Sequence, residues 1–350
     1  MSTRAVKRKD LEQFVEHLLR KADVSPEEAP IISRVIVWTD MIGRFTHGIW
    51  RLPAYLKRIR YGLINSPCHA KFEAKSKTTW ILHGNDGFGQ YLGQLAIRKA
   101  VETAKQFGVS VVGVKNSNHF GAGAYYVQEA AACQCVGFSF SNSVPHVAPH
   151  GGISAVIGTN PFAFAAPVRN GESILVDFST GASAGSAIIK ALEENRSIPE
   201  NIVIDEQGNS ITDPRKAAHG VILPFGGAKG YCLGLMIEIL AGVLTGAGFS
   251  HGVASLHRNF ERPANVGHFF MAIHIEKFLA LEDYFERMEQ LIGFIKEARA
   301  RKDVKEILLP GEMRWRNFKL ADQKGIILPQ KTINLIINLA HEMKIKSPWD

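Results

Sequence analysis

Apolar residues follow two different periodicities along this chain. Near the N-terminus they recur every three or four residues, at Leu11, Phe14, Val15, Leu18 and Leu19, which predicts an amphipathic helix. The same period returns over residues 31–36, 281–300 and 332–343. Both ends of the chain are therefore expected to be helical.

The middle of the chain has short apolar runs separated by glycine, asparagine and proline, a texture typical of strands. Strands are predicted at 109–114, 137–141, 155–158, 162–166 and 174–176, with helices at 90–107 and 125–132. The predicted fold is α/β (α+β), with a mainly helical domain (1–72 plus 285–350) and an α/β domain with a mixed sheet (73–284). The apolar stretch 231–247 contains Glu238 and is too short to span a bilayer, so a buried helix is expected there.

Composition narrows the class of protein. The chain has 350 residues, 46% of them hydrophobic and 21% charged, which are ordinary globular values. Its 4 cysteines are too sparse for a disulfide framework, and no apolar segment follows the basic N-terminus, so a cytoplasmic location and no membrane association are expected. The formal charge of +8 is dispersed, which favours anionic small ligands over nucleic acid.

The chemically richest segment contains His47, Arg51 and Tyr55, spaced four residues apart. On a helix this spacing places the three side chains on one face. Arg can clamp a carboxylate through parallel donors and His can carry a proton at neutral pH, so a carboxylated substrate fits. Pro53 predicts either a kink or a helix that begins near Arg51 with His47 just before it. An ordinary amphipathic helix is the alternative reading.

Three further segments carry polar groups at positions where ligands bind. Glycines precede Ala228 and Lys229 before an apolar helix, which suits an anion, although a plain glycine turn explains the pattern equally well. Asp177 follows a predicted strand, where it either meets a cofactor or caps a turn. His119 is expected on a loop after another strand.

Several common sites are not indicated. His146 and His150 are four residues apart, but Pro149 between them disfavours a helix, so no metal site is predicted. No Gly-x-Ser-x-Gly elbow occurs, and neither glycine-rich segment has the G-x-G-x-x-G spacing or a complete P-loop.

Six separated motifs nevertheless resemble the malate/L-lactate dehydrogenase family of NAD(P)-dependent oxidoreductases, which is unrelated to the Rossmann-type enzymes of similar name. The motifs are Thr46-His47-Gly48 with Arg51-Leu52 and Tyr55, Asn118-His119-Phe120-Gly121, Gly158-Thr159-Asn160-Pro161, Leu223-Pro224-Phe225-Gly226-Gly227 with Lys229-Gly230, Asn265-Val266-Gly267-His268-Phe269-Phe270, and Leu309-Pro310-Gly311-Glu312.

The resemblance implies hydride transfer between NAD or NADP and a small carboxylate substrate, a 2-hydroxy or 2-oxo acid, in a homodimer with a non-Rossmann dinucleotide-binding domain. It places the proton donor at His47, with His119 as second candidate and Arg51 and Tyr55 beside the substrate. It places cofactor contacts at Asn160, Asp177, Phe178, Ser179, Thr180, Ala228, Lys229, Gly311 and Glu312.

The chain departs from the family pattern at two places. Gly185-Ser186-Ala187 stands where Arg-Gly-Lys is usual, and Ala228 stands where His is common. Two positive charges near the cofactor are thereby lost, so the choice between NAD and NADP stays open. A cyclic imine acid reductase on the same scaffold and a catalytically silent ligand-binding homologue are the alternatives.

Overall fold

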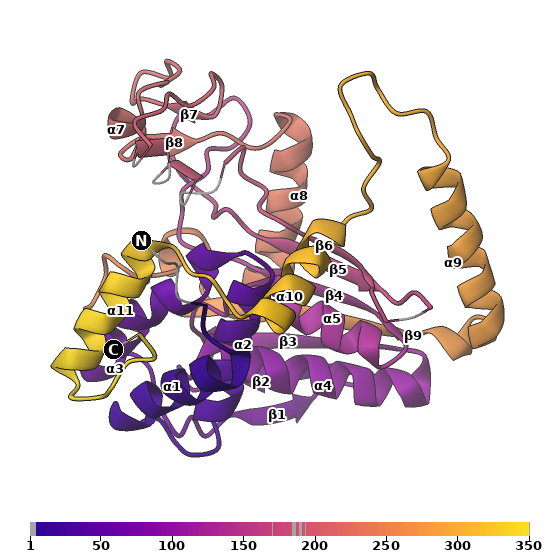
Figure 1. The fold of residues 1–350 in the computed structure, drawn as a ribbon, viewed down its shortest axis with the longest axis horizontal. Helices are drawn as coiled ribbons and strands as arrows, with labels where there is room; N and C mark the ends of the chain where they lie inside the picture. The colour runs from indigo at the N-terminus through magenta and orange to yellow at the C-terminus, as the bar shows by residue number, and fades with distance from the viewer. Residues whose placement is uncertain (1–4, 170, 184–186, 189–190, 193, 350) are drawn as a thin grey trace.

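A mixed seven-stranded sheet forms the centre of the computed structural model, which describes residues 5–169, 171–183, 187–188, 191–192 and 194–349 (Figure 1). Only β2 and β3 pair in parallel, and every other neighbouring pair is antiparallel. In spatial order the strands are β1 (Lys71–Ala74), β2 (Thr79–His83), β3 (Val109–Ser117), β9 (Val266–His274), β4 (Cys135–Ser141), β5 (Phe162–Ala166) and β6 (Ile174–Phe178). The mixed α/β fold predicted from the sequence is thus confirmed.

The strand predictions met different outcomes. The run 162–166 coincides with β5, and the predictions for β3, β4 and β6 are right but short. The strand predicted at 155–158 is wrong, because Ile157 forms only an isolated bridge to Val147. The segment opposite contains Pro145 and Pro149, and proline cannot donate to a strand ladder. The central strand β9, the edge strand β1 and its neighbour β2 were not predicted.

Helices cover both faces of the sheet. On one face, α4 (Gly89–Phe107) packs against β3 and β9, and α5 (Gly123–Ala132) packs against β4 and β5. On the other face, α8 (Ala228–Glu238) continues into a π-helix, η3 (Ile239–Val243). Ile237 and Ala241 from this pair pack with Phe140 of β4.

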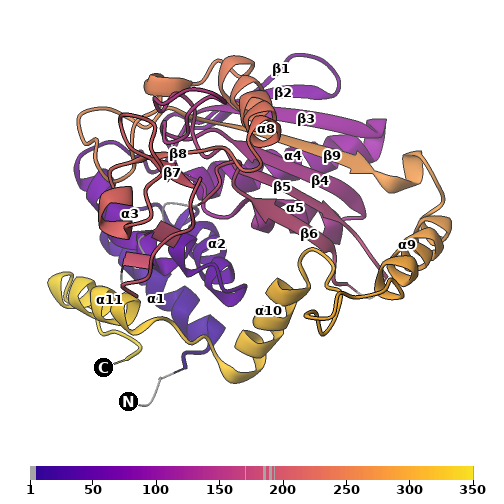
Figure 2. The same cartoon turned by 90° about the horizontal axis from the view of Figure 1, so that it is seen from above.

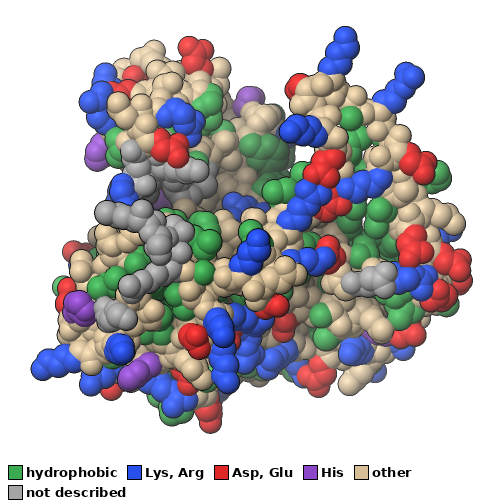
Figure 3. All heavy atoms as spheres, in the orientation of Figure 1, with side chains coloured by type: hydrophobic (Ala, Val, Ile, Leu, Met, Phe, Trp, Pro, Cys, Tyr) green, Lys and Arg blue, Asp and Glu red, His purple; other side chains and the backbone are tan. Residues whose placement is uncertain are grey.

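The prediction of a buried helix over 231–247 is wrong for one of its faces. Its sheet side is buried, but apolar side chains on its outer side are exposed, including Ile239 (47%), Val243 (54%) and Leu244 (63%). In the space-filling view, hydrophobic side chains lie on the surface near α8, beside the lobe that carries the small β7–β8 sheet (Val203–Ile204 and Val221–Ile222) and α7 (Pro214–Ala217) (Figures 1 and 3).

Helices from the two chain ends share a separate apolar core, and the two views place both termini on the same side of the molecule (Figures 1 and 2). The helices of this core are α1 (Arg8–Lys21), α2 (Ala29–Met41), α3 (Leu52–Arg60) and α11 (Gln330–Glu342). The helix α10 (Glu312–Lys324) packs against α2, whereas α9 (Leu281–Lys296) extends away from the body and has no buried residue. The exact domain boundaries stay a prediction.

Short helical turns complete the fold. They are η1 (Phe45–His47), η2 (Ile49–Arg51), η4 (Ser250–Gly252) and η5 (Ile275–Lys277). Among the described residues, no helix is both long enough and apolar enough to cross a membrane.

Candidate active site

The segment around His47 is a pair of short turns that lead into a helix. Phe45–His47 and Ile49–Arg51 are single 3-10 turns, and α3 begins at Leu52 with Pro53 in its first turn. This is the second of the two arrangements that Pro53 allowed, and proline is tolerated at this position because its missing N–H has no partner there.

Asp40 holds the second of these turns in place. The Ile49 N–H donates to the Asp40 carboxyl at 2.8 Å, and Asp40 is only 2% exposed. A Cβ on Gly48 would lie 2.0 Å from Asp40 Oδ1, so only glycine lets the backbone approach this closely. Burial raises the pKa of Asp40 well above its usual value.

The structure brings all four predicted substrate-side residues together. The Tyr55 hydroxyl and His119 Nδ1 are 2.7 Å apart, and the His47 and His119 rings lie 5.5 Å apart between centroids. Arg51 Nε donates to the Thr46 carbonyl at 2.7 Å, which fixes the guanidinium beside the two imidazoles. His47 and His119 come from segments 72 positions apart, 119 minus 47, so the cluster is a product of the tertiary fold.

His119 stands on a rigid frame at the end of β3. Asn118 Nδ2 donates to the carbonyls of Asp86 and Gly87 at 2.9 and 3.0 Å. The Phe120 ring stacks on His268 of β9, with 4.5 Å between ring centroids and 9° between planes. His268 is fully buried between two serine hydroxyls, at 2.8 and 2.9 Å, so a central strand supports the His119 loop.

Sequence reasoning missed two residues that shape this cluster. His257 Nε2 forms a hydrogen bond with Arg51 Nη1 from a loop 206 residues away. Arg58 is fully buried and donates to the carbonyls of Ser255 and Asn259 at 3.3 and 2.7 Å, which anchors that loop. Arg58 lies three residues after Tyr55 in the predicted helix, but nothing local to the loop indicates its role.

The electrostatics keep the imidazoles neutral. Burial, then Arg51 and Arg44, lower the pKa of His47 to about 3. Burial and the same Arg51 lower the pKa of His119 well below its ordinary value, and burial raises the pKa of Tyr55. The free site therefore holds two uncharged imidazoles beside fixed positive charge, an environment that favours an arriving anion.

The predicted cofactor segment 177–180 leaves β6 next to this cluster. Arg44 and Arg314 both donate to the Asp177 carbonyl, and the Asp177 carboxylate accepts from the Ala124 N–H at 3.2 Å. Two arginines, one before the His47 turn and one on α10, are therefore held at the end of β6. Gly185 and Ser186 lie outside the described residues.

The other residues of segment 177–180 make packing contacts or stabilise a turn. The Phe178 ring stacks on Phe162 at 5.4 Å, and the Ser179 hydroxyl accepts from the Gly181 N–H at 3.1 Å. Thr180 is buried and donates its hydroxyl to the Thr159 carbonyl at 3.1 Å. The segment is thus tied to the 159–160 motif.

Asn160 is fully buried, and its amide joins the segment before β5 to α8. Its Nδ2 donates to Glu238 at 2.6 Å and to the Gly234 carbonyl at 2.9 Å. Glu238 also accepts from the Ser250 N–H at 2.7 Å, which explains how a carboxylate is accommodated in an apolar helix.

The glycine turn before α8 has the features expected of an anion site. Gly226 and Gly227 have φ of 56° and 65°, which favours glycine, and a Cβ on Gly230 would lie 2.2 Å from the Phe225 carbonyl. Ala228 and Lys229 are exposed in the first turn of an eleven-residue helix, where backbone N–H groups and an ammonium face solvent.

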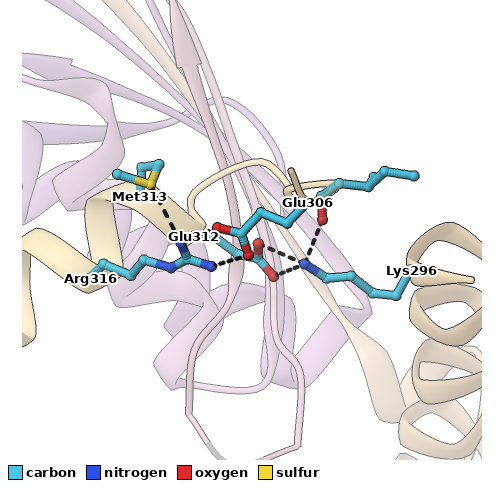
Figure 4. Close-up of polar contacts among 6 residues, drawn as sticks. Lys296, Glu306, Glu312, Met313 and Arg316 are labelled. Carbon is cyan, nitrogen blue, oxygen red and sulfur yellow. Dashed lines mark hydrogen bonds and ion pairs between the residues drawn. The ribbon is translucent and has the colours of Figure 1, made fainter. Parts of the chain in front are cut away.

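The Gly311-Glu312 motif lies across β6, at the start of α10. Gly311 has φ of 97°, and a Cβ there would lie 2.7 Å from Leu175 Cβ. The Glu312 carboxylate pairs with Lys296 at the end of α9, with 2.7 Å between Oε2 and Nζ (Figure 4). Arg316 pairs with Glu306 beside it, so Glu312 belongs to a charged network that joins α9 to α10.

The described residues contain no group of three His, Cys, Asp or Glu side chains that could hold a metal ion.

Residues 6–336 match the family model described as malate/L-lactate dehydrogenase. The chain belongs to the malate/L-lactate dehydrogenase family.

Individual proteins are similar over almost the whole chain. A malate/(S)-sulfolactate dehydrogenase from Methanothermus fervidus is 36% identical over 332 residues, 95% of this chain and 96% of that protein. The structure of a sulfolactate dehydrogenase from Methanocaldococcus jannaschii matches with a TM-score of 0.91 at 33% identity, covering 98% of each chain. The structure of a delta1-piperideine-2-carboxylate reductase from Pseudomonas syringae matches with a TM-score of 0.85 at 29% identity, covering 97% of this chain and 100% of that one.

Family membership confirms the activity predicted from the motifs. The chain is an enzyme, an oxidoreductase that uses a nicotinamide cofactor and acts on 2-hydroxy acids. Family membership also explains the absence of a Rossmann fingerprint. That fingerprint belongs to a parallel sheet, whereas the central sheet of this chain is predominantly antiparallel.

Proposed function

We propose that this dehydrogenase reduces a small 2-oxo acid to the 2-hydroxy acid, with His47 as proton donor and Arg51 as carboxylate clamp. The observation that carries the proposal is the convergence of His47, His119, Tyr55 and Arg51 at one place. When bound, the reduced nicotinamide supplies a hydride to the carbonyl carbon. His47 then gives its proton to the carbonyl oxygen, and the reverse sequence oxidises the alcohol.

Hydrogen-bond geometry assigns different tasks to the two imidazoles. The Gly121 N–H donates to His119 Nδ1 at 3.3 Å, and the Tyr55 hydroxyl lies 2.7 Å from the same nitrogen. Nδ1 must therefore accept, which places the His119 proton on Nε2. His119 suits a fixed donor to the substrate carbonyl. His47 is free of this restriction, because the Thr46 hydroxyl at 3.0 Å from its Nδ1 can either donate or accept.

Substrate charge would make His47 competent as an acid. Its pKa of about 3 in the free site reflects burial and the cations Arg51 and Arg44. A carboxylate bound to Arg51 cancels part of that positive potential, so the pKa of His47 rises towards neutrality when substrate enters. Arg51 then has two roles, orientation of the carbonyl and control of the proton donor.

The residues of the cofactor segments fit a dinucleotide. The crowded Gly230 and the free N–H groups at Ala228 and Lys229 provide a cradle for phosphate. We propose that Asp177, Ser179, Lys229 and Gly311 contact NAD or NADP, while Asn160, Phe178, Thr180 and Glu312 support those contacts through the packing and hydrogen bonds described above.

A cyclic imine acid is the second candidate substrate, favoured by the match to the piperideine carboxylate reductase. The same clamp and proton donor would serve a C=N bond, because the imine also carries a carboxylate beside the reacting carbon. The geometry of His47 and His119 argues against the catalytically silent homologue that the sequence had left open.

The activity is tested by following NADH and NADPH absorbance with a panel of 2-oxo acids, 2-hydroxy acids and cyclic imines. His47→Ala should lower kcat by about 100-fold or more, the usual range for loss of a general acid, with cofactor affinity unchanged. His83→Ala, on β2 where its ring pairs with Glu73, is the matched control. Near-native turnover of His47→Ala would reject its role, and silence of the wild type with both cofactors would reject the reductase.

We also propose a cytoplasmic homodimer. The 16-residue α9 has no buried residue yet exposes Leu291 (51%) and Phe294 (73%), and α8 exposes a second apolar face. An isolated helix gains most of its stability from packing, so a second copy is a natural cover for α9. Light scattering coupled to size exclusion should give a mass near 77 kDa, twice the 38.6 kDa chain. A mass of one chain would contradict the proposal.

A further inference from the structure

A buried glutamine beside the catalytic cluster has no hydrogen bond. Gln90 is 0% exposed in the first turn of α4. Neither its amide nitrogen nor its amide oxygen has a hydrogen-bond partner among the residues that the structure describes. A buried polar group without a partner lowers the stability of a protein, and native proteins keep few of them. The Gln90 amide therefore requires a functional explanation.

The start of α4 is fixed by contacts with two members of the cluster. A Cβ on Gly89 would lie 2.7 Å from the His119 carbonyl oxygen, so the helix backbone touches the His119 loop directly. The Phe88 ring packs edge-on against the Tyr55 ring, with 6.2 Å between centroids. Gln90 follows these two residues, and its position relative to the cluster is thereby fixed.

The Tyr55 hydroxyl is the group of the cluster on which Gln90 acts. Burial raises the pKa of Tyr55, whereas Arg51, through its charge, and the Gln90 amide, as a hydrogen-bonding group, lower it. The amide and the phenol are thus neighbours, although their contact is longer than a hydrogen bond in this structure. Hydrogen bonds in active sites are often long without substrate and tighten when substrate binds.

The chemistry of a phenol decides which atom of the amide faces it. The Tyr55 proton is directed at His119 Nδ1, which also receives the Gly121 N–H and so can only accept. The other side of the phenol oxygen can then only accept a hydrogen bond. The amide nitrogen of Gln90 is a donor and fills that side. While it does so, the Tyr55 hydroxyl cannot rotate away from His119.

We infer that Gln90 is a positioning residue: its amide donates to the Tyr55 hydroxyl in the substrate-bound enzyme and so keeps the proton of His119 on Nε2. The inference rests on the proposed function, because it takes His119 Nε2 as a donor to the substrate carbonyl. Gln90 acts through Tyr55 and does not touch the substrate.

Gln90→Met tests the loss of the amide. The substitution keeps the length of the side chain and removes both unpartnered polar atoms. We expect kcat to fall about 3- to 10-fold, the equivalent of one neutral hydrogen bond. KM should not change, because Arg51 still binds the carboxylate, and urea unfolding should show a variant at least as stable as wild type. Lost stability with unchanged kcat would overturn the inference.

Gln94→Met is the matched control. Gln94 is also 0% exposed, lies one turn further along α4, and likewise has an amide oxygen without a partner among the described residues. Its Nε2 donates to Glu129 at 3.4 Å, so its amide is already engaged away from the cluster. Gln94→Met should leave kcat within about 2-fold of wild type. A loss of kcat equal to that of Gln90→Met would overturn the inference.

Gln90→Glu reverses the direction of the contact without changing the shape of the side chain. An ionised carboxylate only accepts, so it takes the Tyr55 proton, and the phenol oxygen then accepts from His119 Nδ1–H. Burial raises the pKa of such a carboxyl, which at low pH is protonated and donates as the amide does. The ratio of the variant's kcat to that of wild type should therefore fall as pH rises. The ratio removes the titration of the groups around Tyr55, namely Arg51, His119 and Tyr126. A ratio that rises with pH would overturn the inference.

Nitrogen-15 spectra of the imidazoles separate this inference from the proposed function, because they need no substrate. The signals of His119 are assigned by their loss in His119→Gln. Wild type should carry the proton on Nε2, and Gln90→Glu at high pH should carry it on Nδ1. The Nε2–H form in both proteins would overturn the inference, whatever acid the enzyme reduces. The expected change of tautomer with an unchanged kcat would support the control of His119 by Gln90 and would reject the proposed role of His119 in the reaction.

Discussion

Tyr55→Phe removes one oxygen atom from the centre of the cluster. The Tyr55 ring is fully buried and its hydroxyl lies 2.7 Å from His119 Nδ1. Phenylalanine keeps the ring and its edge contact with Phe88, at 6.2 Å between centroids. His119 then keeps only the longer bond from the Gly121 N–H, at 3.3 Å. The loss should therefore be close to one hydrogen bond, about 1 kcal/mol of stability.

Tyr55→Phe should lower kcat strongly while lowering the free energy of unfolding only slightly. Without Tyr55 the His119 ring can rotate, or its proton can move to Nδ1, and either change removes the Nε2 donor from the substrate carbonyl. Loss of one such donor costs about 100-fold in kcat in enzymes where it has been removed. Stopped-flow reduction under saturating cofactor measures kcat, and urea unfolding measures stability.

Tyr284→Phe is the matched control, because its hydroxyl also makes one hydrogen bond, to the Pro167 carbonyl at 3.1 Å, but on α9. It should leave kcat unchanged. If Tyr55→Phe keeps kcat within about 2-fold of wild type while losing the expected stability, the proposed tautomer of His119 has no role in the reaction.

Three other substitutions test buried contacts described above. Gly48→Ala should destabilise the enzyme by about 1–3 kcal/mol in urea unfolding, because its Cβ would overlap the buried Asp40 carboxyl; an unchanged midpoint would contradict the contact. Asn160→Ala should cost about 2–3 kcal/mol, since Glu238 loses a buried donor, and a melting temperature equal to wild type would refute this. Burial lowers the pKa of His268 from 6.5 to about 3, so its contribution is complete above pH 6.5 and is lost as pH falls towards 3, at about 1.4 kcal/mol per pH unit; His268→Asn should show a shallower acid loss of stability.

Local periodicity predicted the parts of the fold that depend on local sequence. The helix at 90–107 differs from α4 by one residue, and β5 is bounded by Pro161 and Pro167, which end the run at both sides. The same reasoning placed His47, Arg51 and Tyr55 together, and the structure has them on two short turns and the start of α3.

Contacts over long sequence distances could not be predicted in this way. β9 lies in the middle of the sheet, but its 9 residues include a glycine and two histidines, and His268 is accommodated only because two serines from other strands meet it. His257 likewise acquires its role from Arg51, 206 residues earlier. In both cases the partner decides the function of the residue, and that partner lies far outside any local stretch of sequence.

The charge distribution explains why substrate entry and proton supply should be coupled in this enzyme. Arg44, Arg51, Arg58 and Arg258 form no ion pair with a carboxylate among the described residues, although all four lie around the two imidazoles or the loop beside them. That positive potential attracts an anion and, until one arrives, keeps His47 and His119 uncharged. A carboxylate on Arg51 therefore supplies both the orientation of the carbonyl and the condition under which His47 can hold a proton. A substrate analogue with an amide in place of that carboxylate should consequently lose kcat as well as affinity, since neither effect can occur without the charge.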